Sequence, residues 1–216
     1  MKTKSDIRTY ILMQRRYIKA SLRRQKSQKV CQQLEAALDP LPGLVAVYAA
    51  MEGELSLDLF ITATYRKGVQ LCFPCMVRTA SARMENGANW EADSASPTHD
   101  ARPSPARMEF RVVSPQDYTG GQAAFVAHPL QSFAPDAPAL EPFAVVDPTR
   151  IGAVVVPLVA FDAHGGRLGY GGGNYDQFLP RLSPGTRIIG VAFAEQEVDH
   201  VPCENHDIAL PELLFA

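Results

Sequence analysis

Arg167-Leu-Gly-Tyr-Gly-Gly-Gly-Asn-Tyr-Asp176 is the segment that indicates the fold class of this chain most strongly. Four glycines lie between positions 169 and 173, with an arginine before them and a carboxylate after them. Glycine backbone can approach a ligand closely and adopt positive φ, and successive exposed N–H groups form a nest that favours anions. We therefore interpret this loop as a phosphate cradle. A flexible glycine turn without a ligand is the alternative.

The segments on either side of the loop predict an α/β fold. Before it, Ile151–Val156 is a short, apolar, β-branched run that is typical of a strand buried on both faces. After it, a helix is predicted to begin near Asn174 and to end at Pro184-Gly185. Its apolar residues recur at helical spacing: Tyr175, Phe178, Leu179 and Leu182. Strand, glycine loop and helix in this order form the phosphate-binding arrangement of α/β proteins.

Helices and strands alternate along the rest of the chain. Helices are predicted over residues 4–38, with a break near Ala20-Ser21, and over Leu57–Arg66. Strands are predicted over Leu44–Ala50, Val69–Phe73 (ended by Pro74), Met108–Val113 and Thr186–Phe193. This alternation predicts an α/β protein with a mostly parallel sheet covered on both faces.

The composition is that of a soluble globular chain. Its 216 residues, 46% hydrophobic and 20% charged, suit one α/β domain with ample core. No apolar run is long enough for a membrane span and the N-terminus lacks a secretory signal, so we expect a cytoplasmic protein. Residues 79–106 are predicted to be a mobile surface insertion. Residues 127–148, with five prolines, are expected to form an ordered crossing segment near the site.

The four cysteines do not indicate a disulfide-rich secreted protein; they are Cys31, Cys72, Cys75 and Cys203. Cys72-Phe-Pro-Cys75 has the spacing of redox and metal sites. Both of these cysteines end an apolar run, and no second pair supplies zinc ligands. We therefore interpret them as small buried hydrophobic residues.

The N-terminal segment is strongly basic. Residues 1–30 carry ten Lys or Arg and one acid, a charge of +9, so the remainder carries −11 in a chain of net charge −2. Such a segment could be a nucleic-acid arm, a mitochondrial presequence or a helix serving an anionic ligand. Aromatic residues for base stacking are sparse there, and we expect no nucleic-acid or membrane partner. An apolar stripe predicts one packed helix face and a solvated basic face; it comprises Ile7, Ile11, Ile18, Leu22 and Val30.

Charged residues outside the loop could complete a site. Lys4 and Arg8 share one helix face, where two cations oppose the helix dipole. An anionic ligand would explain them, and two solvated cations are the alternative. Glu52 and Glu54 follow a predicted strand, and ligands of open parallel sheets bind beyond the carboxyl ends of strands. These two carboxylates could contact a substrate or lie in solvent.

The block from Val156 to Phe178 closely resembles the signature of the 5-formyltetrahydrofolate cyclo-ligase family, also called 5,10-methenyltetrahydrofolate synthetases. Similar segments follow in the family's order over nearly the whole chain apart from residues 79–106. They are Lys4-x-x-Ile-Arg8, Tyr48-x-x-Met-x-x-Glu54, Phe73-Pro74, Met108-Glu-Phe110, Ala192-Phe-Ala-Glu-Gln-Glu-Val198 and Pro202-x-Glu-x-His-Asp207. The resemblance implies a single three-layer α/β/α domain over residues 1–216. It also implies ATP- and Mg²⁺-dependent conversion of 5-formyltetrahydrofolate to 5,10-methenyltetrahydrofolate, with release of ADP and phosphate.

The resemblance also implies roles for particular residues. ATP would be bound by Lys4, Arg8, Arg167, Leu168, Gly169, Tyr170, Gly171, Gly172, Gly173, Asn174 and Tyr175. The folate would be bound by Ala49, Met51, Glu54, Tyr170 and Asn174. Lys4, Arg167 and Tyr175 would take part in catalysis, while Asp176 and Asp207 would hold Mg²⁺. We expect a monomer whose partners are these small molecules.

Three residues depart from the family pattern at the implied site. Tyr170 stands where many relatives have Arg, Asn174 replaces a frequent Tyr, and Gln177 replaces a common Arg. A protein that binds nucleotide or folate with weakened turnover is therefore the alternative function. A sugar-phosphate enzyme on a similar α/β scaffold is a third possibility, because fold does not fix function.

Overall fold

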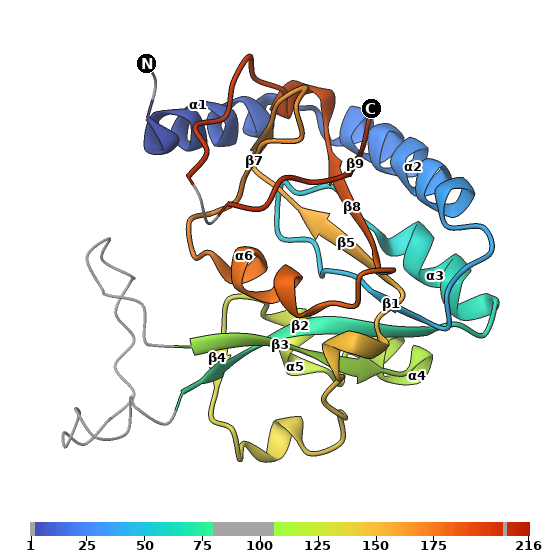
Figure 1. Ribbon diagram of the computed structural model, residues 1–216. Helices are drawn as coiled ribbons and strands as arrows, with labels where there is room; N and C mark the ends of the chain where they lie inside the picture. The colour runs from blue at the N-terminus through green and yellow to red at the C-terminus, as the bar shows by residue number, and fades with distance from the viewer. Residues whose placement is uncertain (1–2, 80–105, 205–206) are drawn as a thin grey trace.

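The computed structural model describes residues 3–79, 106–204 and 207–216 of the chain. Within these ranges seven strands form one sheet, in the order β3-β2-β1-β5-β8-β9 with β4 on β2, and helices cover both sides (Figure 1). Every pairing in this sheet is parallel except that of β2 with β3. The mostly parallel sheet of the α/β prediction is thus confirmed. All but the two ends of the predicted insertion at residues 79–106 lies outside the described residues.

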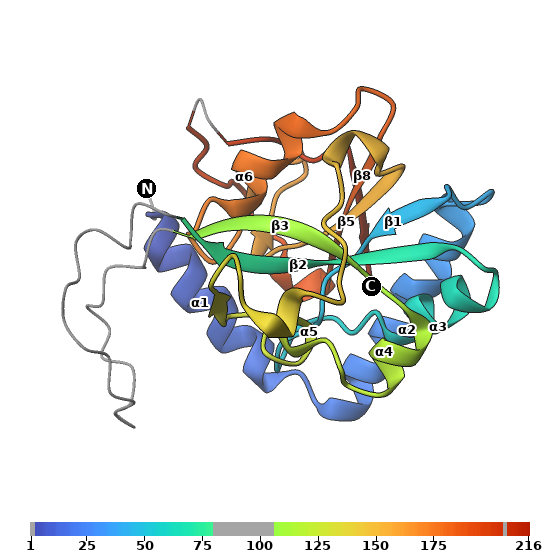
Figure 2. The same ribbon diagram turned by 90° about the horizontal axis from the view of Figure 1, so that it is seen from below.

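The strands vary widely in length. The long antiparallel strands β2 and β3 run side by side in Figure 2. A separate antiparallel hairpin, β6 with β7, leads into the glycine loop. The strands are β1 Leu44–Ala46, β2 Gln70–Arg78, β3 Ala106–Val113, β4 Ser132–Phe133, β5 Ala153–Pro157, β6 Ala160–Phe161, β7 Arg167–Leu168, β8 Arg187–Ala192 and β9 Glu212–Phe215.

The predicted break in the first helix is confirmed. The chain forms two helices there, with extended backbone at Ile18 between them. Thr3 caps the first helix, because its hydroxyl accepts from the Asp6 amide. The α-helices are α1 Lys4–Tyr17, α2 Ala20–Ala37, α3 Asp58–Arg66, α4 Pro115–Thr119, α5 Ala124–Ala127 and α6 Asn174–Phe178. Short 3₁₀ turns are η2 Pro138–Leu140, η3 Pro148–Arg150, η4 Leu179–Arg181 and η5 Ala194–Gln196.

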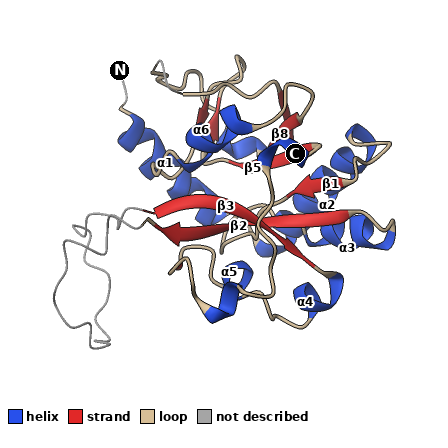
Figure 3. Cartoon of the chain, turned by 60° about the horizontal axis from the view of Figure 1, so that its bottom comes forward, coloured by secondary structure: helices blue, strands red, loops and turns tan. Residues whose placement is uncertain are grey.

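Strand β5 shows why the sheet needs helices on both faces. Its side chains alternate between two apolar cores: Ala153 and Val155 join one, Val154 and Val156 the other. The first core is closed by α2, α3 and α5, the second by α6 and η4. Figure 3 shows α6 on one side of β2 and β3, with α4 and α5 on the other. Each large buried side chain contributes about 1.5–3 kcal/mol, so both faces are stabilised.

Two predicted strand boundaries were wrong. Strand β2 does not end at Pro74 but continues to Arg78, and β1 ends at Ala46 rather than Ala50. Proline fits within β2 because Pro74 lies between the residues that pair with β1 and those that pair with β4. The ladder on that edge is interrupted there.

Helix α1 packs at one end of the sheet, across the β6–β7 hairpin (Figure 1). Ile7 and Ile11 are buried against Val159 and Leu168, as the apolar stripe predicted. Leu22 was wrongly included in the stripe, since it is 40% exposed. Among the described residues no helix combines the length and apolar character needed to cross a bilayer.

Candidate functional site

The glycine loop connects β7 to α6, which begins at Asn174 as predicted. The predicted end at Pro184-Gly185 was wrong, because α6 ends at Phe178 and the 3₁₀ turn η4 follows it. Gly171 has φ 106° and Gly173 has φ 63°, in the left-handed region that residues with side chains rarely adopt. Gly171 and Gly172 are exposed, so a ligand can reach their backbone. Positive φ and an exposed backbone are two of the features that an anion-binding nest requires.

Helix α1 brings two cations to this region. Arg8 Nε donates to the Gly169 carbonyl at 2.8 Å. Lys4 Nζ contacts Asp207 Oδ2 at 2.7 Å and Glu204 Oε1 at 2.8 Å, and these hydrogen bonds raise the pKa of Lys4. The alternative that Lys4 and Arg8 are merely solvated cations is wrong, because both are held against the rest of the protein.

Arg167 and Asp176 fix the two ends of the loop. Arg167 Nη2 lies 2.6 Å from Asp176 Oδ1, and the Arg167 side chain is almost completely buried. Both residues also bind Ile208: Arg167 Nε donates to its carbonyl at 3.2 Å, and Asp176 Oδ1 accepts from its amide at 3.1 Å. The ion pair thus ties the loop to the segment that begins at Asp207.

The turn at Met51–Glu54 contains one buried and one exposed carboxylate. Glu54 Oε2 accepts from the Met51 amide at 2.8 Å, and the Glu54 amide donates to the Met51 carbonyl at 2.9 Å. Glu54 is 8% exposed, and burial raises its pKa. Glu52 is exposed. The solvated alternative therefore holds for Glu52 and is wrong for Glu54.

Tyr170 joins the glycine loop to this turn. Its hydroxyl donates to Glu54 Oε1 at 2.9 Å and accepts from Arg15 Nη1 at 3.2 Å. Burial raises the pKa of Tyr170 to about 12, so the hydroxyl keeps its proton near neutral pH. Arg15 Nε also donates to the Gly53 carbonyl at 3.1 Å. The loop and the turn, predicted separately as two binding regions, thus meet through side chains.

Arg15 was missed in the sequence analysis. It is only 3% exposed, although it lies in the basic segment assigned to a solvated face. Its spacing contained a usable signal, because it follows Ile7 and Ile11 by eight and four residues on the packed face of α1. A cation at such a position indicates a buried polar contact.

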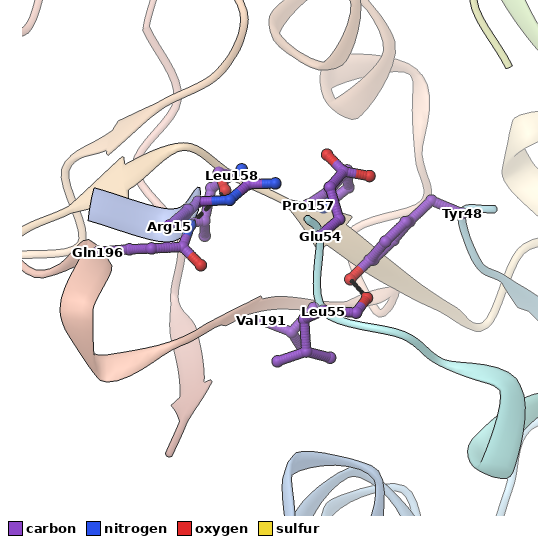
Figure 4. A pocket seen from close by; sticks show the side chains of 8 residues that line it. All are labelled: Arg15, Tyr48, Glu54, Leu55, Pro157, Leu158, Val191 and Gln196. Carbon is purple, nitrogen blue, oxygen red and sulfur yellow. Dashed lines mark hydrogen bonds between the residues drawn. The ribbon is translucent and has the colours of Figure 1, made fainter. Parts of the chain in front are cut away.

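A small pocket lies beside this cluster (Figure 4). The Arg15 guanidinium and the Glu54 carboxylate point toward the same space, and the Tyr48 hydroxyl donates to the Leu55 carbonyl at 2.7 Å. The residues that line the pocket are Arg15, Tyr48, Glu54, Leu55, Pro157, Leu158, Val191 and Gln196. It opens beyond the carboxyl ends of β1 and β5, where parallel sheets bind ligands. Residues 127–148 contribute no lining residue, contrary to their expected place near the site.

The remaining predicted residues take different positions. Ala49 and Met51 are partly buried near the turn, and Asn174 is partly buried at the start of α6. Tyr175 packs against the core beside α6, and burial raises its pKa. Asp176 and Asp207 each contact a cation. Within the described ranges no three His, Cys, Asp or Glu residues gather as a ready metal site.

Comparison with known proteins places these features in a family. Residues 1–216 match the model of the 5-formyltetrahydrofolate cyclo-ligase family. A 5-formyltetrahydrofolate cyclo-ligase of Escherichia coli (strain K12) is 40% identical over 78 residues, 36% of this chain and 43% of that protein. One of Mycoplasma pneumoniae is 38% identical over 91 residues, 42% of this chain and 48% of that protein. The aligned segments thus span less than half the length of these relatives.

Two solved structures share the fold. A 5,10-methenyltetrahydrofolate synthetase from Mycoplasma pneumoniae has a TM-score of 0.68 at 19% identity, over 98% of each chain. The NMR structure of Aquifex aeolicus 5,10-methenyltetrahydrofolate synthetase has a TM-score of 0.64 at 23% identity, over 98% of this chain and 89% of that one. At these identities the likeness concerns the fold alone.

Proposed function

The chain belongs to the 5-formyltetrahydrofolate cyclo-ligase family, and we propose that it catalyses ATP-dependent closure of 5-formyltetrahydrofolate to 5,10-methenyltetrahydrofolate. One observation carries the proposal: Tyr170 of the glycine loop donates to Glu54 of the pocket at 2.9 Å. Transfer of a phosphoryl group between two bound substrates requires that their sites lie side by side. The contact between Tyr170 and Glu54 would place a phosphate-binding loop next to an acidic pocket.

We assign the triphosphate of ATP to the glycine loop. The backbone N–H groups of Gly171 and Gly172 would donate hydrogen bonds to phosphate oxygens, and Lys4 and Arg8 would supply positive charge from α1. Lys4 is held by two carboxylates, so an arriving phosphate would compete with Glu204 and Asp207 for its ammonium group. Arg167 would act by keeping the loop in shape, since its guanidinium is buried against Asp176. Tyr175 supports the loop from the core side.

We assign the folate ring to the region around Glu54, whose carboxylate would accept hydrogen bonds from ring N–H groups. The pocket there has a volume of only about 10 Å³, so the Met51–Glu54 turn and Tyr170 would have to move apart to admit the ring. Ala49 and Met51 lie next to the pocket residues Tyr48 and Glu54 in the chain, and Asn174 would contact the folate from the end of the glycine loop. Tyr170, which contacts both regions, would lie at the boundary between the folate and the phosphates.

Asp176 and Asp207 fit Mg²⁺ by their chemistry. Magnesium prefers oxygen ligands and is bound in such sites by one or two carboxylates together with substrate phosphates. The Asp176 carboxylate accepts from the amide of Ile208, which brings it close to the backbone of Asp207. When bound, Mg²⁺ would neutralise phosphate charge. Each aspartate would then divide its carboxylate oxygens between Mg²⁺ and the cation that it now contacts, Lys4 for Asp207 and Arg167 for Asp176.

The chemistry asks the protein for positioning rather than for a nucleophile. The formyl oxygen of the folate attacks the γ-phosphorus of ATP, and the bond from that phosphorus to the bridging oxygen breaks to release ADP. The phosphorylated oxygen is a good leaving group. The neighbouring folate nitrogen attacks the activated carbon and phosphate departs. The proton of that nitrogen passes to solvent, which leaves the methenyl bridge.

An absorbance assay with single omissions tests the proposal. Methenyl product is expected to accumulate only when 5-formyltetrahydrofolate, ATP and Mg²⁺ are all present. Tight uptake of nucleotide or folate without product would instead identify a binding protein. Turnover of phosphorylated sugars without ATP would identify a sugar-phosphate enzyme. Either outcome would overturn the proposed reaction.

A further inference from the structure

We propose that Arg15 is a positioning residue that joins the Met51–Glu54 turn to the glycine loop, so that each substrate strengthens the binding of the other. The inference rests on the proposed function, because it takes the loop as the nucleotide site and the turn as part of the folate site. It adds a residue that neither assignment includes and a measurable property of the pair of sites.

The contacts of Arg15 reach both regions from one side chain. Nε donates to the Gly53 carbonyl at 3.1 Å and Nη1 donates to the Tyr170 hydroxyl at 3.2 Å. The Tyr170 hydroxyl in turn donates to Glu54 Oε1 at 2.9 Å. The turn is therefore held twice, at its backbone by Arg15 and at its carboxylate through Tyr170.

Helix α1 supports the same loop at a second place. Arg8 lies seven residues, two helical turns, before Arg15, and its Nε donates to the carbonyl of Gly169. Gly169 is the neighbour of Tyr170 in the chain. Movement of α1 is thus transmitted to two adjacent residues of the loop and, through Arg15, to the turn.

The chemistry of this position favours arginine. Within the described residues the hydrogen bonds of Arg15 go to two neutral oxygen atoms, and its charge reaches Glu54 across the Tyr170 hydroxyl. A planar guanidinium presents Nε and Nη1 in a fixed fork, which fits two acceptors held at set positions. A buried cation with neutral partners is costly to desolvate, so the arrangement is explained better by a positioning task than by stability alone.

Reciprocal coupling follows from this geometry. A folate that engages Glu54 orders Tyr170, and Tyr170 is part of the loop that receives ATP. Coupling between two ligands is symmetrical, so ATP must raise folate affinity by the same factor. We expect a factor of about 10, within the range usual for coupled sites.

Binding measurements test the inference directly. The dissociation constant of a non-hydrolysable ATP analogue is measured with and without saturating 5-formyltetrahydrofolate, in wild type, Arg15→Met, Tyr170→Phe and the double variant. The coupling factor is the ratio of the dissociation constant without 5-formyltetrahydrofolate to that with it. We expect this factor to fall from about 10 to near 1 in each single variant, with no further change in the double variant. The matched controls are Arg16→Met and Tyr17→Phe, which alter the two exposed residues that follow Arg15. Both controls should keep the wild-type factor.

Three results would overturn the inference: a wild-type factor near 1, a factor unchanged in Tyr170→Phe, or a factor unchanged in folded Arg15→Met. Tyr170 is 48% exposed, so its loss of one hydroxyl leaves a folded protein to measure even if Arg15→Met unfolds. The proposed function is judged separately by wild-type turnover. If the wild type turns over but shows no coupled binding, only the role proposed for Arg15 is wrong. If binding is coupled but there is no turnover, only the proposed reaction is wrong.

Discussion

At the scale of single residues, the charged groups of the site are already held by protein partners. Lys4 contacts two carboxylates, Arg167 contacts Asp176, and the Glu54 carboxylate accepts from Tyr170 and the Met51 amide. Groups fixed in this way are held in place before a ligand arrives, and Lys4 would exchange its carboxylate partners for phosphate when ATP binds. Charged groups held in place before the reaction are a major electrostatic contribution of proteins to phosphoryl transfer.

Replacing Lys4 tests this contribution. If its ammonium group contacts the transferring phosphoryl group, Lys4→Ala should lower kcat/KM. The loss should correspond to about 2–4 kcal/mol of transition-state stabilisation. Steady-state kinetics of the cyclisation measure the change. Lys29→Ala, at an exposed position on α2, is the control and should leave kcat/KM near the wild-type value. Equal kinetics in both variants would remove Lys4 from the site.

Glu54 gives a prediction about pH. Burial raises its pKa above the ordinary 4.5, so the folded protein binds this proton more tightly than the unfolded chain does. The stabilisation that protonated Glu54 gives to the folded protein is complete below pH 4.5 and is lost as pH rises through the raised pKa of Glu54 in the folded state. The unfolding free energies of the wild type and of Glu54→Gln can be measured by urea titration. The wild-type value minus the variant value should fall as pH rises from about 4.5 to 7. A difference for Glu54→Gln that does not change with pH would refute the prediction.

At the scale of elements, the glycine loop restricts substitution at Gly171. Gly171 has φ 106°, and a Cβ there would lie 3.5 Å from the Arg8 guanidinium carbon. We expect Gly171→Ala to lower the unfolding free energy by about 1–2 kcal/mol through backbone strain, and to weaken ATP binding. Denaturant titration and nucleotide titration measure the two effects. Gly185→Ala is the control, because open space surrounds its Cβ position; similar losses in both variants would contradict the strain argument.

The elements that could be predicted from sequence are those specified by local patterns. The buried run that became β5, the break before α2 and the start of α6 each followed from apolar spacing or from glycine and proline. The extension of β2 past Pro74 could not be predicted, because it depends on pairing with β3 and β4. Tertiary pairing can override a local stop signal.

The same distinction applies to the candidate site. The glycine loop and the turn near Glu54 were predictable from residue types that suit ligands. The contact of the Glu54 carboxylate with Tyr170 was not, because it joins residues 116 positions apart in the chain. The role of Arg15 was hidden for the same reason. The roles of the individual site residues remain predictions.

At the scale of the whole molecule, the fold separates its thiols into two classes. Cys31, Cys72 and Cys75 are buried and Cys203 is exposed, which confirms that the C-x-x-C cysteines are core residues. Burial raises the pKa of Cys31 and of Cys75 to about 11, and also raises that of Cys72, so few thiolates form in the interior.

Thiol titration should reveal these two classes. With a disulfide reagent at neutral pH, the native protein should react quickly at one thiol, and the other three should react only after unfolding. Cys203→Ser should abolish the fast reaction, while Cys75→Ser should leave it unchanged. Rapid reaction of more than one thiol in the native state would show that the sheet opens far more readily than its packing indicates.

The contact of Lys4 with Glu204 and Asp207 joins positions that lie 200 and 203 residues apart. A growing chain on the ribosome therefore cannot complete this corner of the protein until residue 207 has left the exit tunnel. A ligand that bound at this corner could therefore assist only the last stage of maturation, and earlier stages would proceed without it.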